Sequence, residues 1–503
     1  MKWGNSRSRA SAFARQTDSA AGKRLVSLPQ PASFRHTGSL NSRIRPANTP
    51  VSPARAAAFD ILLRVERESS YASDLLHSAA YERLSTPDHA LATELVMGVL
   101  RWRSRLDAGI ALASAQSLSK LDVEILIALR LALYQFFWLD RIPQRAALHQ
   151  SVELAKRARK RSAAPFVNAV LRKLSALSRN RNEDASTEGE PASVEALARA
   201  LAHPPWLVER WAREYGFSAA RQICQHNQAI PATAIRLRTP TAEKQLQHDG
   251  VSLSPGGLLA SARRVEAGDI TKTPSFRAGQ IAILDEASQL VAALVGSVDL
   301  EERSRILDCC AAPGGKTLAI ADHNPAVAIT AVELHPQRAR LLQKLLLASQ
   351  SSARISIVAA EAQHLPLSLQ FDRILADVPC SGTGTLARNP EIKWRLRLDD
   401  LAKLHTRQVA ILRSALAQLA PGGRLIYSTC SLEKEENENV VDEVLSETNG
   451  FRPLDCRDDL ARLKESGELT WPDPTLLASG PYLRTIPGVH PCDGFFAAIL
   501  ERA

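Results

Sequence analysis

Long apolar runs are missing from this chain of 503 residues. No stretch of about 18 consecutive apolar residues occurs, which argues against a helix that spans a membrane. The first residues also lack the apolar core of a secretory signal. Cysteine is scarce, since seven residues in a chain of this length do not form a disulfide scaffold. We therefore expect a cytoplasmic protein that keeps its thiols reduced.

Positive charge is concentrated at one end of the chain. Residues 1–50 hold nine Lys or Arg and one acidic residue, Asp18, so this segment carries +8 and the other 453 residues only +2 of the total +10. A uniformly basic surface is excluded, and contact with a polyanion must use local patches. Residues 1–50 are rich in Ser, Arg, Ala and Pro without an apolar period, which predicts a disordered basic arm. A transit peptide and an extension without a dedicated role are the alternatives.

Helical periodicity dominates residues 51–178. Leu126, Leu129 and Leu133, for example, recur at helical spacing, and no strand-like alternation appears in this region. We predict an all-α bundle here. A polar stretch at 179–193 follows and predicts a linker.

Strand patterns begin after this linker, so the chain is expected to be multidomain. Residues 194–290 combine a helical stretch with short alternating segments, which predicts a small α+β subdomain. Residues 291–503 alternate strand and helix patterns, which predicts a Rossmann-like α/β domain with a parallel, doubly wound sheet. The expected strands of this domain are 305–309, 328–333, 355–358, 373–376 and 424–428.

A Gly-rich loop follows the first of these strands. It reads Asp308-Cys309-Cys310-Ala311-Ala312-Pro313-Gly314-Gly315-Lys316-Thr317. Small residues let a ligand approach the backbone at the carboxyl edge of the sheet, and Glu333, at the end of the next strand, stands where an acid typically binds ribose hydroxyls. The loop ends like a phosphate-binding Walker motif, but Cys310 stands where that motif requires glycine, which disfavours an NTPase.

Two further cysteines follow later strands and fall at the same edge of the predicted sheet. The segments are Asp377-Val378-Pro379-Cys380-Ser381-Gly382 and Ser428-Thr429-Cys430-Ser431. Thiolates are strong nucleophiles, and without a C-x-x-C pair or clustered histidines we expect no metal. Methylation at C5 of a pyrimidine uses this chemistry, because a thiolate that adds to C6 activates C5 while a carboxyl group at N3 stabilises the adduct. The residues alone do not decide which cysteine attacks.

Together these motifs resemble the Sun/Fmu family of ribosomal RNA cytosine-C5 methyltransferases, over about residues 51–503. Three more segments match this family: Arg388-Asn389-Pro390-Glu391, Glu435-Glu436-Asn437 and Asp493-Gly494-Phe495-Phe496. The helical region, through Phe166-Val167-Asn168-Ala169-Val170-Leu171-Arg172, resembles the antitermination factor NusB, which binds RNA. This added helical region points to the bacterial members of the family that modify the RNA of the small ribosomal subunit. The resemblance implies 16S ribosomal RNA as substrate, S-adenosyl-L-methionine as methyl donor and a monomeric class I methyltransferase. It also implies that the small subdomain at 194–290 binds RNA.

The resemblance also implies a role for each residue of the site. Cys430 is the implied nucleophile, Cys380 is implied to help release the product, and Asp377 is implied to contact the cytosine. The implied donor contacts are Cys310, Ala311, Ala312, Pro313, Gly314, Gly315, Lys316, Glu333 at the ribose, Glu361 near the adenine, and Asp377. Glu361 departs from the family pattern, which has Asp after a glycine, whereas Ala360 precedes it here.

Other functions remain possible at this point. DNA cytosine-C5 methyltransferases use a Pro-Cys nucleophile and a Glu-Asn-Val triplet; Pro379-Cys380 and Glu438-Asn439-Val440 match by letter, but the triplet lies in a predicted helix. A methyltransferase acting on another RNA is a related alternative. An RNA-binding assembly or antitermination factor with an inactive fold is disfavoured by the intact Asp377, Cys380 and Cys430.

A basic run lies near the end of one predicted helix of the helical region. Its residues are Lys156, Arg157, Arg159, Lys160 and Arg161. The run predicts that this region contacts RNA phosphates. A solvated helix face is the alternative.

Overall fold

The computed structural model describes residues 51–503 except 69, 115, 181–189, 297–299, 350 and 352. The predicted basic arm at 1–50 and most of the predicted linker therefore lie outside the described residues. Among the helices that are described, none is both long and apolar enough to cross a membrane.

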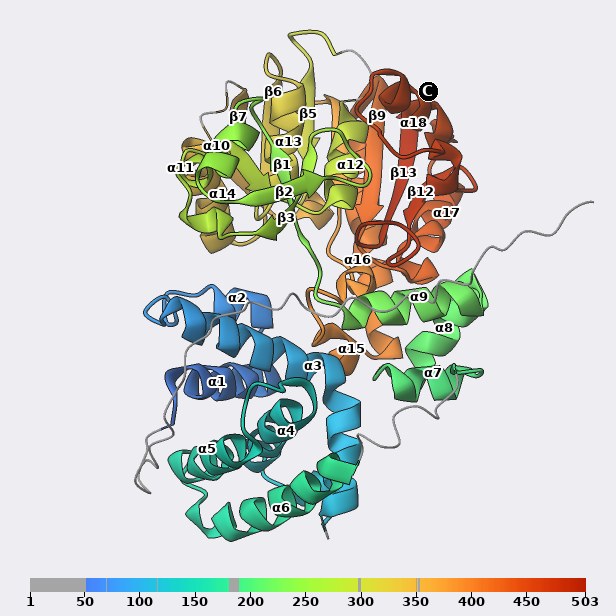
Figure 1. Cartoon of the computed structure of the whole chain (residues 1–503). Helices are drawn as coiled ribbons and strands as arrows, with labels where there is room; N and C mark the ends of the chain where they lie inside the picture. The colour runs from blue at the N-terminus through green and yellow to red at the C-terminus, as the bar shows by residue number, and fades with distance from the viewer. Residues whose placement is uncertain are drawn as a thin grey trace, which may run out of the picture. The chain divides into compact units, whose positions relative to one another are not determined.

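Six helices form the first part of the described chain, the helical domain (Figure 1). They are α1 (Pro53–Glu68), α2 (Ala72–Leu76), α3 (Thr86–Ala113), α4 (Val123–Trp138), α5 (Gln144–Arg157) and α6 (Ala164–Asn180). The start of α3 follows from its sequence, because Ser85 accepts a hydrogen bond from the Asp88 amide at 3.3 Å and Pro87 occupies the first turn. One apolar core joins α1 to α6, which confirms the predicted all-α bundle.

A small subdomain follows, in which three helices precede a segment of alternating strands and short helices. Its helices are α7 (Val194–Ala200), α8 (Pro205–Tyr215), α9 (Phe217–Gln228), α10 (Ala242–His248) and α11 (Pro274–Arg277). Its strands are β1 (Thr233–Leu237), β2 (Ser252–Pro255), β3 (Ala262–Ala267) and β4 (Ile281–Ile283). The four strands form an antiparallel sheet in the order β2-β3-β1-β4.

The remaining strands form the large sheet of the α/β domain. They are β5 (Arg305–Asp308), β6 (Ala328–Glu333), β7 (Arg354–Ala359), β8 (Phe371–Asp377), β9 (Leu419–Thr429), β10 (Phe451–Leu454), β11 (Ala478–Ser479), β12 (Tyr482–Thr485) and β13 (Phe495–Arg502). The order is β11-β12-β13-β9-β8-β5-β6-β7, and β10 pairs with β13. Strands β5 to β9 are parallel, as predicted. The strand patterns did not indicate β10 to β13, which join the parallel strands antiparallel.

Helices cover both faces of this sheet and give it two apolar cores. The helices are α12 (Glu286–Val295), α13 (Gly315–His323), α14 (Pro336–Ala348), α16 (Leu398–Ala417), α17 (Glu438–Glu447) and α18 (Cys456–Glu465). The short helix α15 (Ile392–Arg395) packs instead against α7 to α9. One core contains residues of α12, α13 and α18, and the other contains residues of α16 and α17. Helix α12 is buried along its whole length. The predicted boundary after residue 290 therefore divides a helix that the sequence pattern did not indicate.

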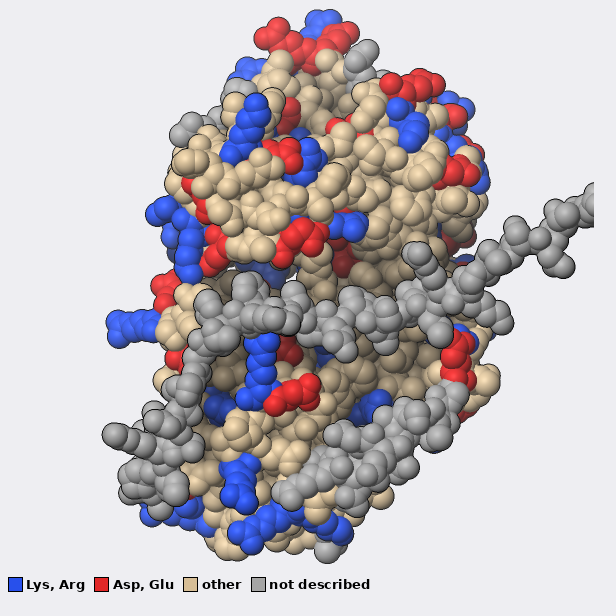
Figure 2. Space-filling model, viewed as in Figure 1, with Lys and Arg blue, Asp and Glu red and all other residues tan. Residues whose placement is uncertain are grey.

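Charge is distributed unevenly over the described surface. Figure 2 shows Lys and Arg side chains gathered at the end of the helical domain, near α6 in Figure 1, and both signs mixed over the α/β domain. In α6, Arg172 and Lys173 are exposed. The helical domain thus presents the kind of local basic patch that the charge balance of the sequence predicts.

Candidate active site

The predicted site residues meet at the carboxyl edge of the parallel strands. Asp308, Glu333 and Asp377 end β5, β6 and β8, and Cys430 follows β9. A cavity of about 550 Å³ opens at this edge. Its lining includes Cys310, Ala312, Pro313, Glu333, Glu361, Asp377, Cys380 and Cys430.

The Gly-rich loop after β5 is shaped by a buried carboxyl group. Asp308 accepts a hydrogen bond from the Thr317 hydroxyl at 2.7 Å and a longer one from the Cys310 amide at 3.4 Å. Burial raises the pKa of Asp308 to about 6, against the opposing hydrogen bond from Thr317. Gly314 has a φ of 113°, and a Cβ there would lie 2.5 Å from Leu342, so the loop needs glycine at this position.

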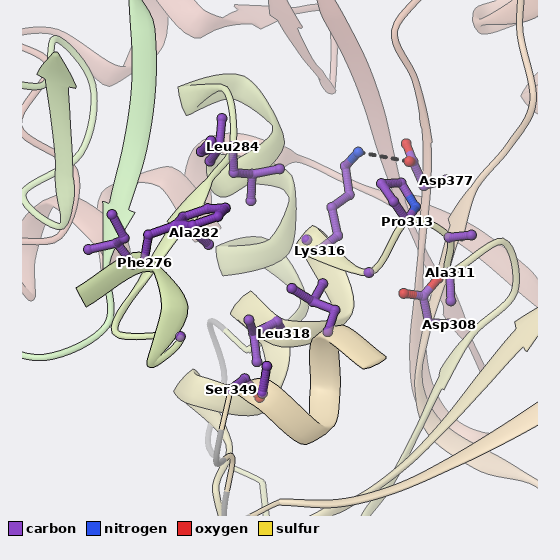
Figure 3. Close-up of a pocket in the computed structure, with 18 of the residues that line it drawn as sticks. Phe276, Ala282, Leu284, Asp308, Ala311, Pro313, Lys316, Leu318, Ser349 and Asp377 are labelled. Atoms are coloured by element: carbon purple, nitrogen blue, oxygen red, sulfur yellow. Dashed lines mark hydrogen bonds and ion pairs between the residues drawn. The ribbon is translucent and has the colours of Figure 1, made fainter. Parts of the chain in front are cut away.

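A second cavity, of about 470 Å³, borders the same loop (Figure 3). It extends from the loop to Phe276 and Leu284 of the small subdomain and to Leu318 of α13. Its labelled lining is largely apolar, apart from Lys316, Asp308, Asp377 and Ser349. Ala311, Gly314, Gly315 and Lys316 line it, so all seven predicted loop contacts border one of the two cavities.

Lys316 and Asp377 form an ion pair in the site (Figure 3), with Nζ 2.8 Å from Oδ2. The other carboxylate oxygen of Asp377 accepts a hydrogen bond from the Ser428 hydroxyl at 2.8 Å. Burial opposes the positive charge of Lys316, but Asp377 and, to a smaller extent, Cys430 raise the pKa of Lys316 overall. A lysine cation is therefore maintained beside the predicted catalytic carboxylate and nucleophile.

The two cysteines of the later motifs are in contact. Cys380 Sγ lies 3.2 Å from Cys430 Sγ. The hydrogen bond to Cys430, together with burial, raises the pKa of Cys380 well above its ordinary value. Cys380 is consequently a protonated thiol at neutral pH.

Glu436 fastens the two cysteine loops to each other. Its buried carboxylate accepts hydrogen bonds from the Ser381 amide at 2.8 Å, from the Ser381 and Ser431 hydroxyls at 2.5 Å, and from Gln408 at 2.9 Å. Asn437 adds a hydrogen bond to the Ser431 carbonyl at 3.0 Å. Both residues belong to the Glu435-Glu436-Asn437 segment, for which the sequence alone predicted no role.

Two glycines bring the cysteine loops against the end of the chain. Gly384 donates to the Cys430 carbonyl at 2.9 Å, and Gly494 donates to the Gly384 carbonyl at 2.9 Å. A Cβ at Gly384 would lie 2.2 Å from the Gly494 carbonyl oxygen. The closing Asp-Gly-Phe-Phe motif is therefore explained by packing against the loop after Cys380.

Glu333 and Glu361 lie on the cavity wall together with an arginine. Glu333 accepts a hydrogen bond from the His335 amide at 2.9 Å, and Glu361 accepts one from the Gln363 amide at 3.4 Å. Arg407, on α16, lies 3.8 Å from Glu361 and lines the same cavity, although sequence reasoning missed it.

Residues of the helical domain also line this cavity, and sequence reasoning missed them. They are Tyr71, Ser73 and Asp74, at the start of α2. No local signal marks them, because their position depends on contacts with Asn389 and Glu391, more than 300 residues further along the chain.

The parallel sheet, its Gly-rich loop and the acid after the second strand define a Rossmann-like methyltransferase with an added helical domain. Comparisons with known proteins identify the family. The model of the family 16S rRNA methyltransferase RsmB/F matches residues 295–501, and that of the NusB family matches residues 52–176. The chain belongs to the RsmB/F family of 16S rRNA methyltransferases.

Individual proteins resemble the chain over most of its length. It is 32% identical over 463 residues to a probable ribosomal RNA small subunit methyltransferase B of Bacillus subtilis, which covers 89% of this chain and 98% of that protein. It is 31% identical over 471 residues to a probable ribosomal RNA small subunit methyltransferase B of Synechocystis sp., which covers 90% of this chain and 99% of that protein. The crystal structure of PH0851 shares the fold, with a TM-score of 0.73 and 22% identity over 90% of this chain and 99% of that one.

Proposed function

We propose that this chain transfers a methyl group from S-adenosyl-L-methionine to C5 of a cytosine in 16S ribosomal RNA. The reaction proceeds through a covalent bond between Cys430 Sγ and C6 of the base. The observation that carries the proposal is the contact between Cys380 and Cys430 at 3.2 Å, in a cavity that Asp377 also lines. The enzyme acts as a monomer in the cytoplasm, where ribosomal RNA is made.

The residues at the sheet edge fit the methyl donor. Small residues from Cys310 to Gly315 leave room beside the backbone, and Lys316, at the end of the loop, pairs with Asp377 at the end of β8. Glu333 would hold the ribose hydroxyls, and Glu361 would lie near the adenine. When bound, the donor supplies an electrophilic methyl group.

The protein's own residues account for activation of the base. Cys430 Sγ bonds to C6, and the electron pair of the C5–C6 bond moves to C5, which becomes nucleophilic. Negative charge develops at N3 in this step, and Asp377 would stabilise it by donating a proton to N3, which its ion-pair partner Lys316 supplies. After methylation, C5 passes its proton to solvent, and the C–H electron pair restores the C5–C6 double bond as the Sγ–C6 bond breaks. N3 returns its proton to Asp377, and Cys430 leaves as the thiolate.

The contact between the two thiols supports a division of roles. One sulfur can bond to C6 while the other holds a proton beside the adduct. The resemblance of the two motifs assigns the attack to Cys430 and the release step to Cys380.

Tritium release from RNA labelled at C5 of cytosine tests the proposal directly. The wild-type chain should release tritium only with the methyl donor present, and bisulfite sequencing of ribosomal RNA from a deletion strain should locate the cytosine. Calorimetry should detect binding of the methyl donor and none of ATP. Tight ATP binding without donor binding, or release from DNA but not RNA, would overturn the assignment.

A further inference from the structure

The helical domain is anchored to the segment that follows the Cys380 motif. The buried Glu391 carboxylate accepts a hydrogen bond from the Ala72 amide at 2.8 Å. Nearby, the Trp394 indole donates to the Leu100 carbonyl at 2.6 Å, and Lys393 Nζ donates to the Arg101 carbonyl at 3.0 Å. These contacts lie within the compact unit Pro50–Ala503 and place the start of α2 beside the catalytic edge.

Tyr71 is the aromatic residue that this anchoring brings to the cavity. It directly precedes Ala72, and it lines the cavity together with Cys380 and Cys430. Its neighbour Ser73 reaches Asn389 at 3.3 Å, which fixes this stretch on the cysteine side of the cavity.

The Tyr71 ring has no evident structural role. Its exposed fraction is 43%, and it is absent from the core that joins the helices, although Tyr81 packs against that core. Within the described part of the chain, its hydroxyl has no hydrogen-bond partner. Partial burial and the nearby Glu391 raise the pKa of Tyr71, so its hydroxyl stays neutral. A large aromatic side chain that stays 43% exposed on the wall of a cavity is available to a ligand.

We propose that Tyr71 contacts the target nucleotide, so that the helical domain completes the cytosine pocket. This inference rests on the proposed function. A base must leave its stack to reach a thiol at the bottom of a cavity, and an extruded base is commonly held against an aromatic ring. Tyr71 is a base-binding wall of the pocket, and the helical domain is part of the substrate site as well as a tether for RNA.

Substitution of Tyr71 tests this contact. Tyr71→Ala should lower kcat/KM for RNA by about 5- to 150-fold, the effect expected for one stacked base, whereas Tyr71→Phe should stay within about threefold of wild type. Donor affinity, measured by calorimetry, should not change in either variant. Leu112→Ala is the matched control, because Leu112 is 78% exposed on the helical domain and does not line the cavity.

An abasic substrate separates a base contact from a general defect. Once the target cytosine is known, Tyr71→Ala should weaken binding of RNA that carries this cytosine, but not of RNA with an abasic site there. If Tyr71→Ala unfolds, Tyr71→Leu repeats the test with the apolar volume kept. Wild-type activity in Tyr71→Ala, or an equal loss with abasic RNA, overturns the contact alone. A wild-type chain that methylates no cytosine overturns the proposed function as well.

Discussion

Cys380 Sγ lies 3.2 Å from Cys430 Sγ, although the two residues are 50 positions apart in the sequence. The neighbouring parallel strands β8 and β9 bring them together, with Asp377 paired in register to Ser428. Glu436 then joins the two loops through Ser381 and Ser431. This arrangement holds the two thiols in contact.

Replacement of each cysteine should give different products. Cys430→Ala should abolish methylation and form no covalent adduct, because C5 is never activated. Cys380→Ala should still form the Cys430–C6 bond and transfer the methyl group, and should then stall with RNA attached. Denaturing gels of each variant with RNA and donor distinguish the two. A trapped complex in Cys430→Ala, and none in Cys380→Ala, would reverse the roles.

Glu436→Ala should separate activity from donor binding. The change removes the acceptor of four hydrogen bonds in a buried site, and should lower the free energy of unfolding by about 2–4 kcal/mol. Methylation should fall much further than donor affinity, since the cysteine loops lose their shared anchor. Glu435→Ala serves as the control. The Glu435 side chain is 37% exposed and pairs with Arg210, so this change leaves the hydrogen bonds of Glu436 to Ser381 and Ser431 in place. Full methylation in a folded Glu436→Ala variant would contradict this role.

The parallel core could be predicted because its signals are local. Strand and helix periods lie within short windows, and parallel strands bring their carboxyl ends to one edge, which is why Asp308, Glu333, Asp377 and Cys430 meet. The antiparallel additions were missed for physical reasons. β11 has only two residues, and Phe495–Arg502 is buried at six of eight positions and shows no alternation.

Residues whose role depends on tertiary contacts could not be predicted. Glu436 lies in an acidic stretch of the kind that is ordinarily solvated, yet it is fully buried between two loops. Tyr71 reaches the cavity only because Glu391, 319 residues away from Ala72 in the sequence, holds the start of α2. No short window of sequence contains Ser381 together with Glu436, or Ala72 together with Glu391.

Asp308 should make stability depend on pH. Its pKa rises from 3.8 to about 6 on folding, so the protonated carboxyl group favours the folded state. This contribution is complete below about pH 4 and is lost as the pH rises through 6, an effect of about 3 kcal/mol. Asp308→Asn keeps a side-chain oxygen that can accept the hydrogen bond from Thr317. Its amide does not titrate, so the variant does not lose stability as the pH rises. The unfolding free energy of the variant relative to wild type should therefore rise between pH 4 and 6.

Urea unfolding at several pH values measures this difference. Asp140→Asn is the control, because Asp140 is exposed in a turn and its substitution should shift stability by no more than about 0.5 kcal/mol at any pH. A difference for Asp308→Asn that stays constant from pH 4 to 7 would mean that Asp308 titrates normally.

The basic run of the helical domain should contribute to RNA binding unequally, because acids already neutralise part of it. Lys156 pairs with Glu153 at 2.7 Å, Arg157 with Asp60 at 2.7 Å, and Lys160 with Asp122 at 2.9 Å. Two members of the run, Arg159 and Arg161, are exposed and have no acidic partner among the described residues. These two arginines are therefore free to meet phosphates.

Salt titrations of RNA affinity should separate these two groups of residues. The double variant Arg159→Ala/Arg161→Ala should weaken binding and lower the slope of log K against log salt by roughly two units, one for each phosphate that the arginines no longer neutralise. The double variant Lys156→Ala/Arg157→Ala removes the same formal charge but should lower the slope by less than one unit, because the acids paired with these residues already offset their charge. Equal slopes for both variants and wild type would show that this run is a solvated surface and that RNA contacts the helical domain elsewhere.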